Sequence, residues 1–183
     1  MPRRRHWAWE IARSGRDEGG GALQAVRLAP MDEAEYEAWA TRKVGEYAAD
    51  HAKSDGTTVE DALERARQEF ATLLPAGLRS PNMHLLRACD ADSGEPVGLL
   101  WLAERGAAGR RQAFIYDIEV HPGLRGRGYG RALLTAAEDE ARRLGLARIS
   151  LHVFGHNTAA IRLYETSGFA VTNLLMAKEL PAK

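Results

Sequence analysis

The stretch His121–Ala132, HPGLRGRGYGRA, separates a strand-like segment from a helix-like one. Before it, Ala113–Val120 (AFIYDIEV) is rich in β-branched and aromatic residues and is short enough to form a buried strand. After it, Arg131–Leu144 carries apolar residues at helical spacing. The quoted stretch is therefore predicted to be a glycine-rich connection from a strand to a helix.

This connection has the features of an anion site. The first turn of a helix has unpaired N–H donors and a partial positive charge, so a phosphate is a favourable ligand there. Glycines leave the backbone open to such a ligand, and arginines add positive charge: Gly126, Gly128, Gly130, Arg125, Arg127 and Arg131. A plain connection whose arginines face water is the alternative. The Lys-Ser/Thr pair of a Walker loop and the glycine spacing of the dinucleotide fingerprint are both missing, which disfavours a nucleotide-phosphate binder.

The rest of the chain predicts further strands and helices around this connection. The expected strands are Ala22–Leu28, Met83–Cys89, Val97–Ala103, Ala113–Val120, Arg148–Phe154 and Ala170–Leu180. The expected helices are 32–53, 58–74, Arg131–Leu144 and Thr158–Ser167, the first two preceded by capping-box spacings at Asp32–Glu35 and Thr57–Glu60. This order predicts a mixed α/β sheet, with a ligand beyond the carboxyl end of the strand that feeds the glycine loop.

Length and composition narrow the class of protein. At 183 residues the chain suits one domain, and we expect a flexible tail over 1–21 and a single domain over 22–183. Basic and acidic residues balance at 25 each, so no net charge favours a nucleic-acid or membrane partner. The single cysteine, Cys89, suits a reducing compartment. With no apolar run near the roughly 20 residues that span a bilayer, we expect a cytoplasmic protein.

Two motifs together resemble one known family. Arg125-x-x-Gly128-x-Gly130 resembles the acyl-coenzyme A pyrophosphate loop of the GNAT superfamily of N-acetyltransferases. The run Asn157–Phe169 is similar to the other GNAT signature, N-x-x-A-x-x-L-Y-x-x-x-G-F, and is much more specific. Asn157 and Tyr164 are seven residues apart, so they project from nearly one helix face. Alone, Asn157 would be read as a helix cap and Tyr164 as a core residue, but with the loop present the resemblance is favoured.

The resemblance implies a fold, an activity and a site. It implies the GNAT fold, a mixed central sheet flanked by helices, and transfer of acetyl from acetyl-CoA to a primary amine by direct attack, with no metal. The backbone near Val120 would pair with the pantetheine amides, Asn157 would bond the pantetheine arm, and Tyr164 would lie near the thioester sulfur. Backbone N–H groups of the loop would hold the pyrophosphate: Arg125, Gly126, Arg127, Gly128, Tyr129 and Gly130. A non-catalytic acyl-CoA sensor or interaction domain on the same fold is the alternative, and a homodimer is one option for the oligomeric state.

The sequence offers several candidates for the residue that removes the proton from the amine. Family members that use a glutamate on the loop-feeding strand carry it early in that strand, near where this chain has Phe114. Asp117 and Glu119 lie on that strand but alternate opposite to Phe114, unless a bulge changes the parity. An unperturbed histidine, with a pKa near 6.5, suits a base at neutral pH, and His152 has a sequence context similar to that of a histidine base in some family members. We predict that His152 rather than Glu119 relays the proton, with a structural histidine or a water relay as alternatives. The acceptor is expected to bind near 32–82, where no motif identifies it.

Overall fold

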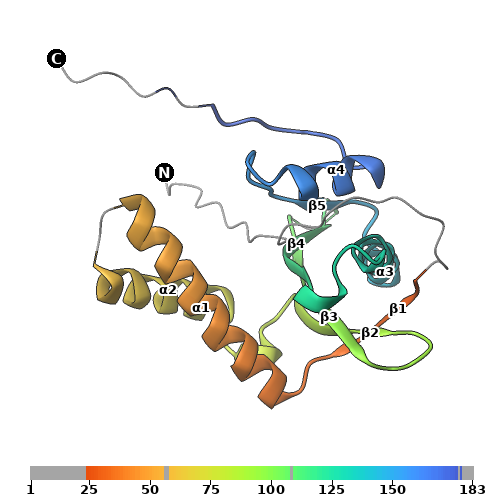
Figure 1. The fold of residues 1–183 in the computed structure, drawn as a ribbon, viewed down its shortest axis with the longest axis horizontal. Helices are drawn as coiled ribbons and strands as arrows, with labels where there is room; N and C mark the ends of the chain where they lie inside the picture. Colours follow the sequence, from red (N-terminus) through yellow and green to blue (C-terminus); the bar gives the residue numbers. More distant parts are fainter. Residues whose placement is uncertain (1–23, 56–57, 108, 177, 179–183) are drawn as a thin grey trace.

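The computed structural model describes residues 24–55, 58–107, 109–176 and 178 (Figure 1). Its strands are β1 (Val26–Pro30), β2 (Met83–Asp90), β3 (Pro96–Arg105), β4 (Gln112–Val120) and β5 (Ile149–Leu151). Its helices are α1 (Glu33–Asp55), α2 (Val59–Leu73), α3 (Tyr129–Arg143) and α4 (Thr158–Thr166), with short 3-10 turns η1 (Gly77–Arg79) and η2 (Pro122–Leu124).

The strands form one mixed sheet in the order β1-β2-β3-β4-β5. The first three pairs are antiparallel, whereas β4 and β5 are parallel and are connected through α3. Helices α1 and α2 lie on one side of the sheet, and α3 lies on the other (Figure 1). The predicted α/β fold, a mixed sheet flanked by helices, is confirmed.

Each face of the sheet carries its own core. Toward α3 and α4 the core is aliphatic, with Leu100 and Leu102 of the sheet against Leu133 and Leu134 of α3. Toward α1 and α2 the core is aromatic, and its members are Trp39, Phe70, Trp101 and Tyr116. The ring centroids of Trp101 and Tyr116 are 4.5 Å apart in a stacked arrangement. The two faces of β4 therefore meet chemically different surroundings.

The starts of the first two helices test the predicted capping boxes. At α1 the box is confirmed, since the backbone N–H of Glu35 donates to Asp32 Oδ1 (2.9 Å) and that of Asp32 donates to Glu35 Oε2 (2.8 Å). At α2 the expected pair is wrong by one residue. The cap is Thr58, whose Oγ1 accepts from the N–H of Asp61 at 3.1 Å. Thr57 lies outside the described residues.

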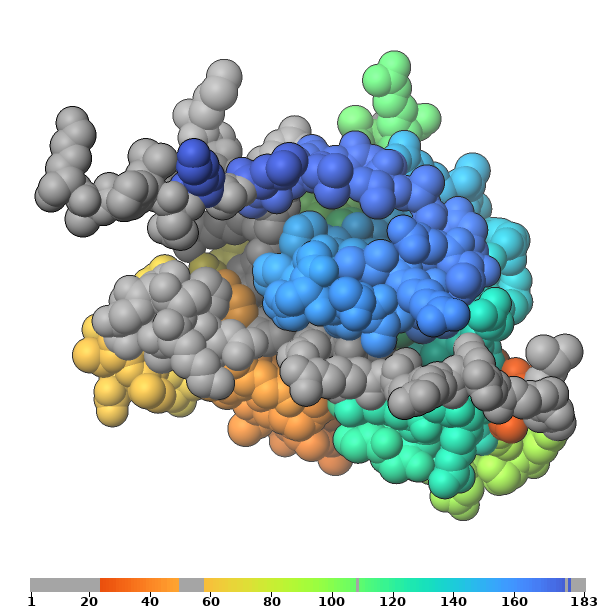
Figure 2. Space-filling model, turned by 45° about the horizontal axis from the view of Figure 1, so that its top comes forward, coloured from red at the N-terminus to blue at the C-terminus, as the bar shows by residue number. Residues whose placement is uncertain are grey.

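Three predicted strands differ from the structure. The first begins at Val26, with 24–25 outside the strand and Ala22 outside the described residues, and the fifth extends only over Ile149–Leu151. The expected last strand, Ala170–Leu180, is wrong where it can be judged, because 170–176 form neither strand nor helix. Its large apolar side chains are exposed along the outside of the molecule, as the blue segment of Figure 2 shows: Val171, Leu174, Leu175 and Met176. Alternating apolar residues make a strand only where a neighbouring strand offers backbone partners in register.

The predicted tail over 1–21 lies outside the described residues, so the division into a tail and one domain stays a prediction. None of the helices in the described ranges is long and apolar enough to cross a membrane.

Candidate active site

A β-bulge in β4 decides which side chains face α1. In the pairing of β3 with β4, Trp101 is opposite Asp117 and Leu102 is opposite Ile115, so Tyr116 is the extra residue. A bulge of this kind shifts the alternation of side chains by one position. Tyr116 and Asp117 consequently both face the aromatic core, and Trp39 Nε1 on α1 donates to Asp117 Oδ2 at 3.0 Å.

The bulge corrects one expectation about β4. Simple alternation placed Asp117 and Glu119 on the face opposite Phe114. In the structure they share the face of Phe114 and Tyr116, while Ile118 and Val120 point into the aliphatic core. The two carboxylates are therefore on the side of the sheet that α1 covers.

Strands β4 and β5 separate at this same point. Their parallel pairing is confined to Ala113–Ile115 of β4 and Ile149–Leu151 of β5, whereas β4 continues to Val120. Beyond the bulge, the edge of β4 that faced β5 has no neighbouring strand in the described part of the chain. Backbone groups on a free strand edge can pair with an extended ligand. This edge also lies at the carboxyl end of the two parallel strands, where ligands of α/β sheets are expected.

The glycine loop leads directly from this edge into α3. Gly128 is the N-cap of α3 and has φ +88°, a left-handed backbone conformation that residues with a Cβ rarely adopt. Gly126 has φ +73°. Gly128 has no side chain to cap α3, so the first N–H groups of the helix are left to another acceptor. The loop thus has the backbone geometry of an anion site.

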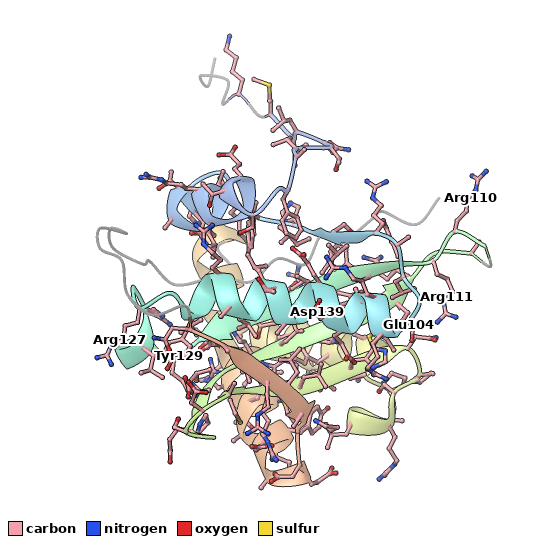
Figure 3. The ribbon with its side chains drawn as sticks, turned by 90° about the vertical axis from the view of Figure 1, so that its right-hand side faces the viewer. Glu104, Arg110, Arg111, Arg127, Tyr129 and Asp139 are labelled. Carbon is pink, nitrogen blue, oxygen red and sulfur yellow. The ribbon has the colours of Figure 1, made fainter. Side chains whose placement is uncertain are left out.

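Side chains of the loop bind its two ends to the rest of the fold. Arg125 Nε donates to the carbonyl oxygen of Val120 at 3.0 Å, and the hydroxyl of Tyr129 donates to Asp90 Oδ2 at 2.8 Å. Hydrogen bonds from Ser93, Tyr129 and the neighbouring backbone lower the pKa of Asp90 to about 2. Arg127 is exposed and points away from the body, at the same end of α3 as Tyr129 (Figure 3). Its guanidinium therefore supplies charge at the surface and does not build the loop.

Helix α4 brings the second motif beside the loop. A Cβ added at Gly130 would come within 3.1 Å of Leu163 Cδ2, and Arg131 Nη2 donates to Thr166 Oγ1 at 3.4 Å. The two motifs are 27 residues apart when counted from Gly130 to Asn157, yet the helices that carry them pack together. The structure therefore brings the predicted cofactor motifs to one place.

Asn157 and Tyr164 have distinct places on α4. Asn157 is the N-cap, with its Oδ1 accepting from the N–H of Ala160 at 3.2 Å, so its capping role is real. Tyr164 is 6% exposed and packs its ring against Phe169, with the centroids 5.6 Å apart. Burial and the nearby negative charge of Asp117 raise the pKa of Tyr164. Its hydroxyl therefore stays protonated at neutral pH and can donate a hydrogen bond.

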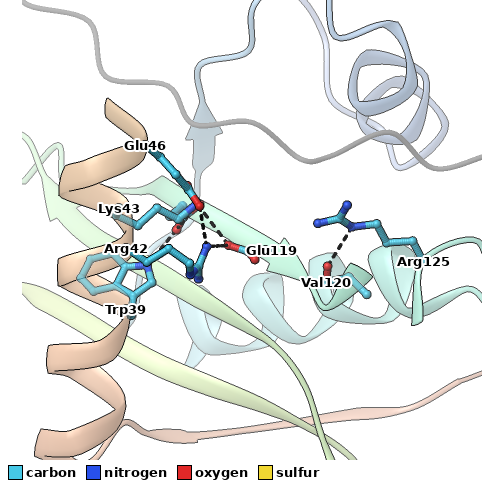
Figure 4. A network of polar contacts seen from close by, with 8 residues as sticks. Trp39, Arg42, Lys43, Glu46, Glu119, Val120 and Arg125 are labelled. Carbon is cyan, nitrogen blue, oxygen red and sulfur yellow. Dashed lines mark hydrogen bonds and ion pairs between the residues drawn. The ribbon is translucent and has the colours of Figure 1, made fainter. Parts of the chain in front are cut away.

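Two carboxylates on β4 meet two cations on α1 (Figure 4). Lys43 Nζ lies 3.3 Å from Asp117 Oδ2 and 3.1 Å from Glu119 Oε2. Arg42 Nη1 donates to the same Glu119 Oε2 at 3.0 Å. Glu46, one helical turn further along α1, pairs with both cations. These residues, Arg42, Lys43, Glu46, Asp117 and Glu119, are called the charged cluster below.

Burial and charge act in opposite directions on the two carboxylates. For Asp117, whose side chain is 1% exposed, burial raises the pKa and outweighs the opposing effects of Lys43 and Trp39. For Glu119, burial would raise the pKa, but Lys43 and Arg42 together lower it below its ordinary value. Glu119 is therefore ionised at neutral pH and is too weak a base to deprotonate an alkylammonium group by itself.

The remaining candidates for the base lie along the edges of this region. Phe114 is apolar, packs against Tyr116 and has the Arg105 guanidinium 4.7 Å above its ring, so no proton acceptor stands there. His152 directly follows the end of β5, half-buried, with its ring edge-on to Phe154. It therefore borders the point where β4 and β5 separate. No described group of three or more His, Cys, Asp or Glu residues could hold a metal ion.

Sequence reasoning missed the α1 half of the charged cluster. Trp39, Lys43 and Glu46 are spaced by four and three residues, so they share one helix face. That face includes the core residue Trp39, which was a signal that Lys43 is buried. The partners of Lys43 were hidden because they depend on the bulge in β4.

Comparisons with known proteins bear on the family and the fold. A profile of the Acetyltransferase (GNAT) family matches residues 49–169. The "Uncharacterized N-acetyltransferase YycN" of Bacillus subtilis (strain 168) is 36% identical over 155 residues, which are 85% of this chain and 99% of that protein. The crystal structure of YycN has a TM-score of 0.77, with 35% identity over 86% of this chain and all of that chain.

Two further comparisons concern proteins with named activities. The mycothiol acetyltransferase of Propionibacterium freudenreichii is 36% identical over 135 residues, which are 73% of this chain and 40% of that longer protein. The structure of AAC(6')-Iy in complex with the bisubstrate analogue CoA-S-monomethyl-acetylneamine has a TM-score of 0.53. At 17% identity over 86% of this chain and 99% of that chain, it shows a shared fold only.

Proposed function

Because the chain belongs to the acetyltransferase (GNAT) family, we propose that it transfers the acetyl group of acetyl-CoA to a primary amine by direct attack on the thioester. The observation that carries this proposal is the meeting of three features at one end of the sheet. These are the glycine loop, the free edge of β4 beyond the bulge, and the buried residue Tyr164.

Acetyl-CoA fits this arrangement from one end to the other. The pyrophosphate would accept from the N–H groups of the loop between Arg125 and Gly130, where α3 begins. The pantetheine arm would lie along β4 near Val120 and extend that edge by backbone pairing. Asn157 would contribute its side-chain amide to the arm from the start of α4. The thioester would then reach Tyr164, which lies two helical turns further on.

In the chemical step the amine nitrogen attacks the acetyl carbonyl carbon and forms the amide bond. The C–S bond breaks, and its electron pair leaves with the sulfur of CoA. Tyr164 would donate a hydrogen bond to that sulfur as negative charge develops. A phenol with a raised pKa is a weaker acid than a thiol with a pKa of about 8.5. A hydrogen bond that stabilises the thiolate is therefore favoured over full proton transfer from Tyr164.

The amine must lose a proton before it attacks. At pH 7 a lysine-like amine with a pKa of about 10.4 needs roughly 4.6 kcal/mol to expose its lone pair, whereas an α-amine near 8 needs about 1.4 kcal/mol. A positioned base therefore matters most for an alkylamine. We assign this role to His152, because the cations around Glu119 lower the pKa of that carboxylate.

The base assignment predicts a pH dependence. The profile of kcat/KM should show an acidic limb near the histidine pKa, because His152 accepts a proton only when it is neutral. His152→Gln should remove that limb, and Glu119→Gln should leave it in place. The measurement needs a low-pKa amine, so that titration of the acceptor stays separate. A limb that survives His152→Gln and vanishes in Glu119→Gln would reverse the assignment.

An acceptor screen tests the function itself. Thiol release from acetyl-CoA is measured with polyamines, aminoglycosides, amino acids and peptides with free N-termini, and products are identified by mass spectrometry. Turnover with at least one amine is expected. CoA binding without turnover across the panel would instead support the second candidate, a non-catalytic acyl-CoA sensor. The observation that favours this candidate is Phe114, which stands near the position where some family members carry a glutamate.

A further inference from the structure

The charged cluster contains a buried lysine that the proposed reaction does not yet use. Lys43 is on α1, outside both sequence motifs, and its side chain is only 3% exposed. Lysine is almost never buried unless it is paired. Here Nζ is within 3.3 Å of three carboxylates, those of Glu46, Asp117 and Glu119. Such a site is an ion-pair network built across two elements, α1 and β4.

Lys43 offsets the repulsion between the two carboxylates that the bulge brings to the α1 side of the sheet. Residues two apart on a strand share a face, and the bulge turns the face that carries Asp117 and Glu119 toward α1, where the two negative charges repel each other beside the helix. Lys43 sits between them and contacts Asp117 Oδ2 and Glu119 Oε2. Arg42 adds a second cation on Glu119 from the more exposed side, where its own side chain is 41% exposed. Removal of Lys43 would leave two neighbouring carboxylates with one cation fewer.

The two oxygens of Glu119 are used unequally. Oε2 receives both Arg42 and Lys43, at 3.0 and 3.1 Å. Oε1 has no hydrogen bond to any described residue, and the side chain is 11% exposed. A carboxylate that is held through one oxygen keeps lone pairs on the other, which can accept a further donor with defined geometry. A protonated amine supplies such a donor.

We propose that Lys43 is a positioning residue for the acceptor: it contacts Glu119 Oε2 and holds the carboxylate turned so that Oε1 receives the acceptor's ammonium group. This proposal rests on the proposed function and adds that the acceptor binds as a cation before it loses its proton. Glu119 then docks the amine, and the proton leaves by another group. The effect of Lys43 should therefore be on acceptor binding rather than on the breaking of the thioester.

The direction of the pH effect follows from the charges that face Glu119. From α1 these are Arg42, Lys43 and Glu46, and from β4 the neighbour is Asp117. In the wild type, Glu119 stays ionised down to a pH below its ordinary pKa. Without Lys43 its pKa should rise, and acceptor binding should be lost at a higher pH as the solution is made more acidic.

The first arm of the test needs no acceptor. The pKa of Glu119 is measured by NMR titration of protein labelled with carboxyl-¹³C glutamate, with its signal assigned by its absence in Glu119→Gln. We expect Lys43→Met to raise the pKa by about one unit or more and Lys43→Arg to restore most of the difference. An unchanged pKa in folded Lys43→Met would overturn the proposal.

The second arm uses an amine that the screen has shown to be acetylated. Lys43→Met should raise KM for that amine about tenfold or more, increasingly so at lower pH, while kcat stays within a few-fold. A lower kcat with unchanged KM would contradict the assignment. If no amine is acetylated, the proposed function fails, whereas the NMR arm still judges the role of Lys43.

A double variant is the control for misfolding of Lys43→Met. Lys43→Met alone leaves buried Asp117 without its cation, so the chain is also tested as Lys43→Met/Asp117→Asn, which removes both buried charges. Circular dichroism establishes the fold of each variant. The pKa of Glu119 should still rise in the double variant, though by less, because the negative charge of Asp117 is gone as well. No rise in the double variant would also count against the proposal.

Discussion

Replacement of Tyr164 by phenylalanine is expected to lower kcat by about 10²–10³-fold, the usual range for loss of one hydrogen-bond donor to negative charge that develops in the transition state. Affinity for CoA should stay within a few-fold. The hydroxyl acts on charge that develops at sulfur only as the thioester breaks, so its loss affects the transition state more than the bound substrate. Steady-state kinetics at saturating acetyl-CoA, with calorimetric titration of CoA, measure the two quantities.

The ring of Tyr164 supplies the control for this prediction. It packs against Phe169 in the buried core, and phenylalanine preserves that packing. The raised pKa of the hydroxyl means that the lost group was neutral, so no buried charge is uncovered. Pre-steady-state measurements establish whether chemistry limits turnover. If chemistry limits turnover and saturated rates are unchanged, Tyr164 is a core residue only.

Valine at Gly128 is expected to weaken CoA binding by at least about tenfold. The residue has φ +88°, and a β-branched side chain in that conformation costs roughly 1–3 kcal/mol. Among the atoms of the described residues, an added Cβ would meet only Gln24 Cγ, at 3.6 Å. The harm would therefore come from a backbone that relaxes and turns its N–H groups away from the pyrophosphate.

Arg127→Ala is the matched control for the loop, because it removes a full charge but leaves the backbone unchanged. Arg127 is exposed, so its contribution to CoA binding should be only a few-fold and should shrink as salt is added. Calorimetric titration of CoA into both variants compares backbone with side-chain binding. Undiminished CoA affinity in Gly128→Val would contradict the placement of the pyrophosphate on this loop.

Local patterns predicted the parts of the fold that depend on local physics. Helical spacing and a capping box located α1 to within two residues at each end. Glycines that need left-handed conformations marked the loop before α3, and the spacing of Asn157 and Tyr164 identified α4. These signals are readable because each one acts within a few residues of the chain.

The features that the sequence did not reveal depend on long-range pairing. The bulge at Tyr116 arises from the register of β3 against β4, and the residues next to it in sequence carry no signal that predicts it. Without the bulge, Asp117 and Glu119 could not be placed beside α1, and Lys43 had no visible partner. The expected strand after Ala170 failed for a related reason, because alternation describes side chains but does not supply a paired neighbour.

The measurement that tests the site most directly is a crystal structure of this chain with CoA bound. The pyrophosphate should lie on the N–H groups of the loop between Arg125 and Gly130, and the pantetheine arm along β4 beyond Tyr116. The sulfur should come within hydrogen-bonding reach, about 3.5 Å, of the Tyr164 hydroxyl. CoA bound away from the loop, or a sulfur distant from Tyr164 with the pantetheine off β4, would contradict the proposed active site.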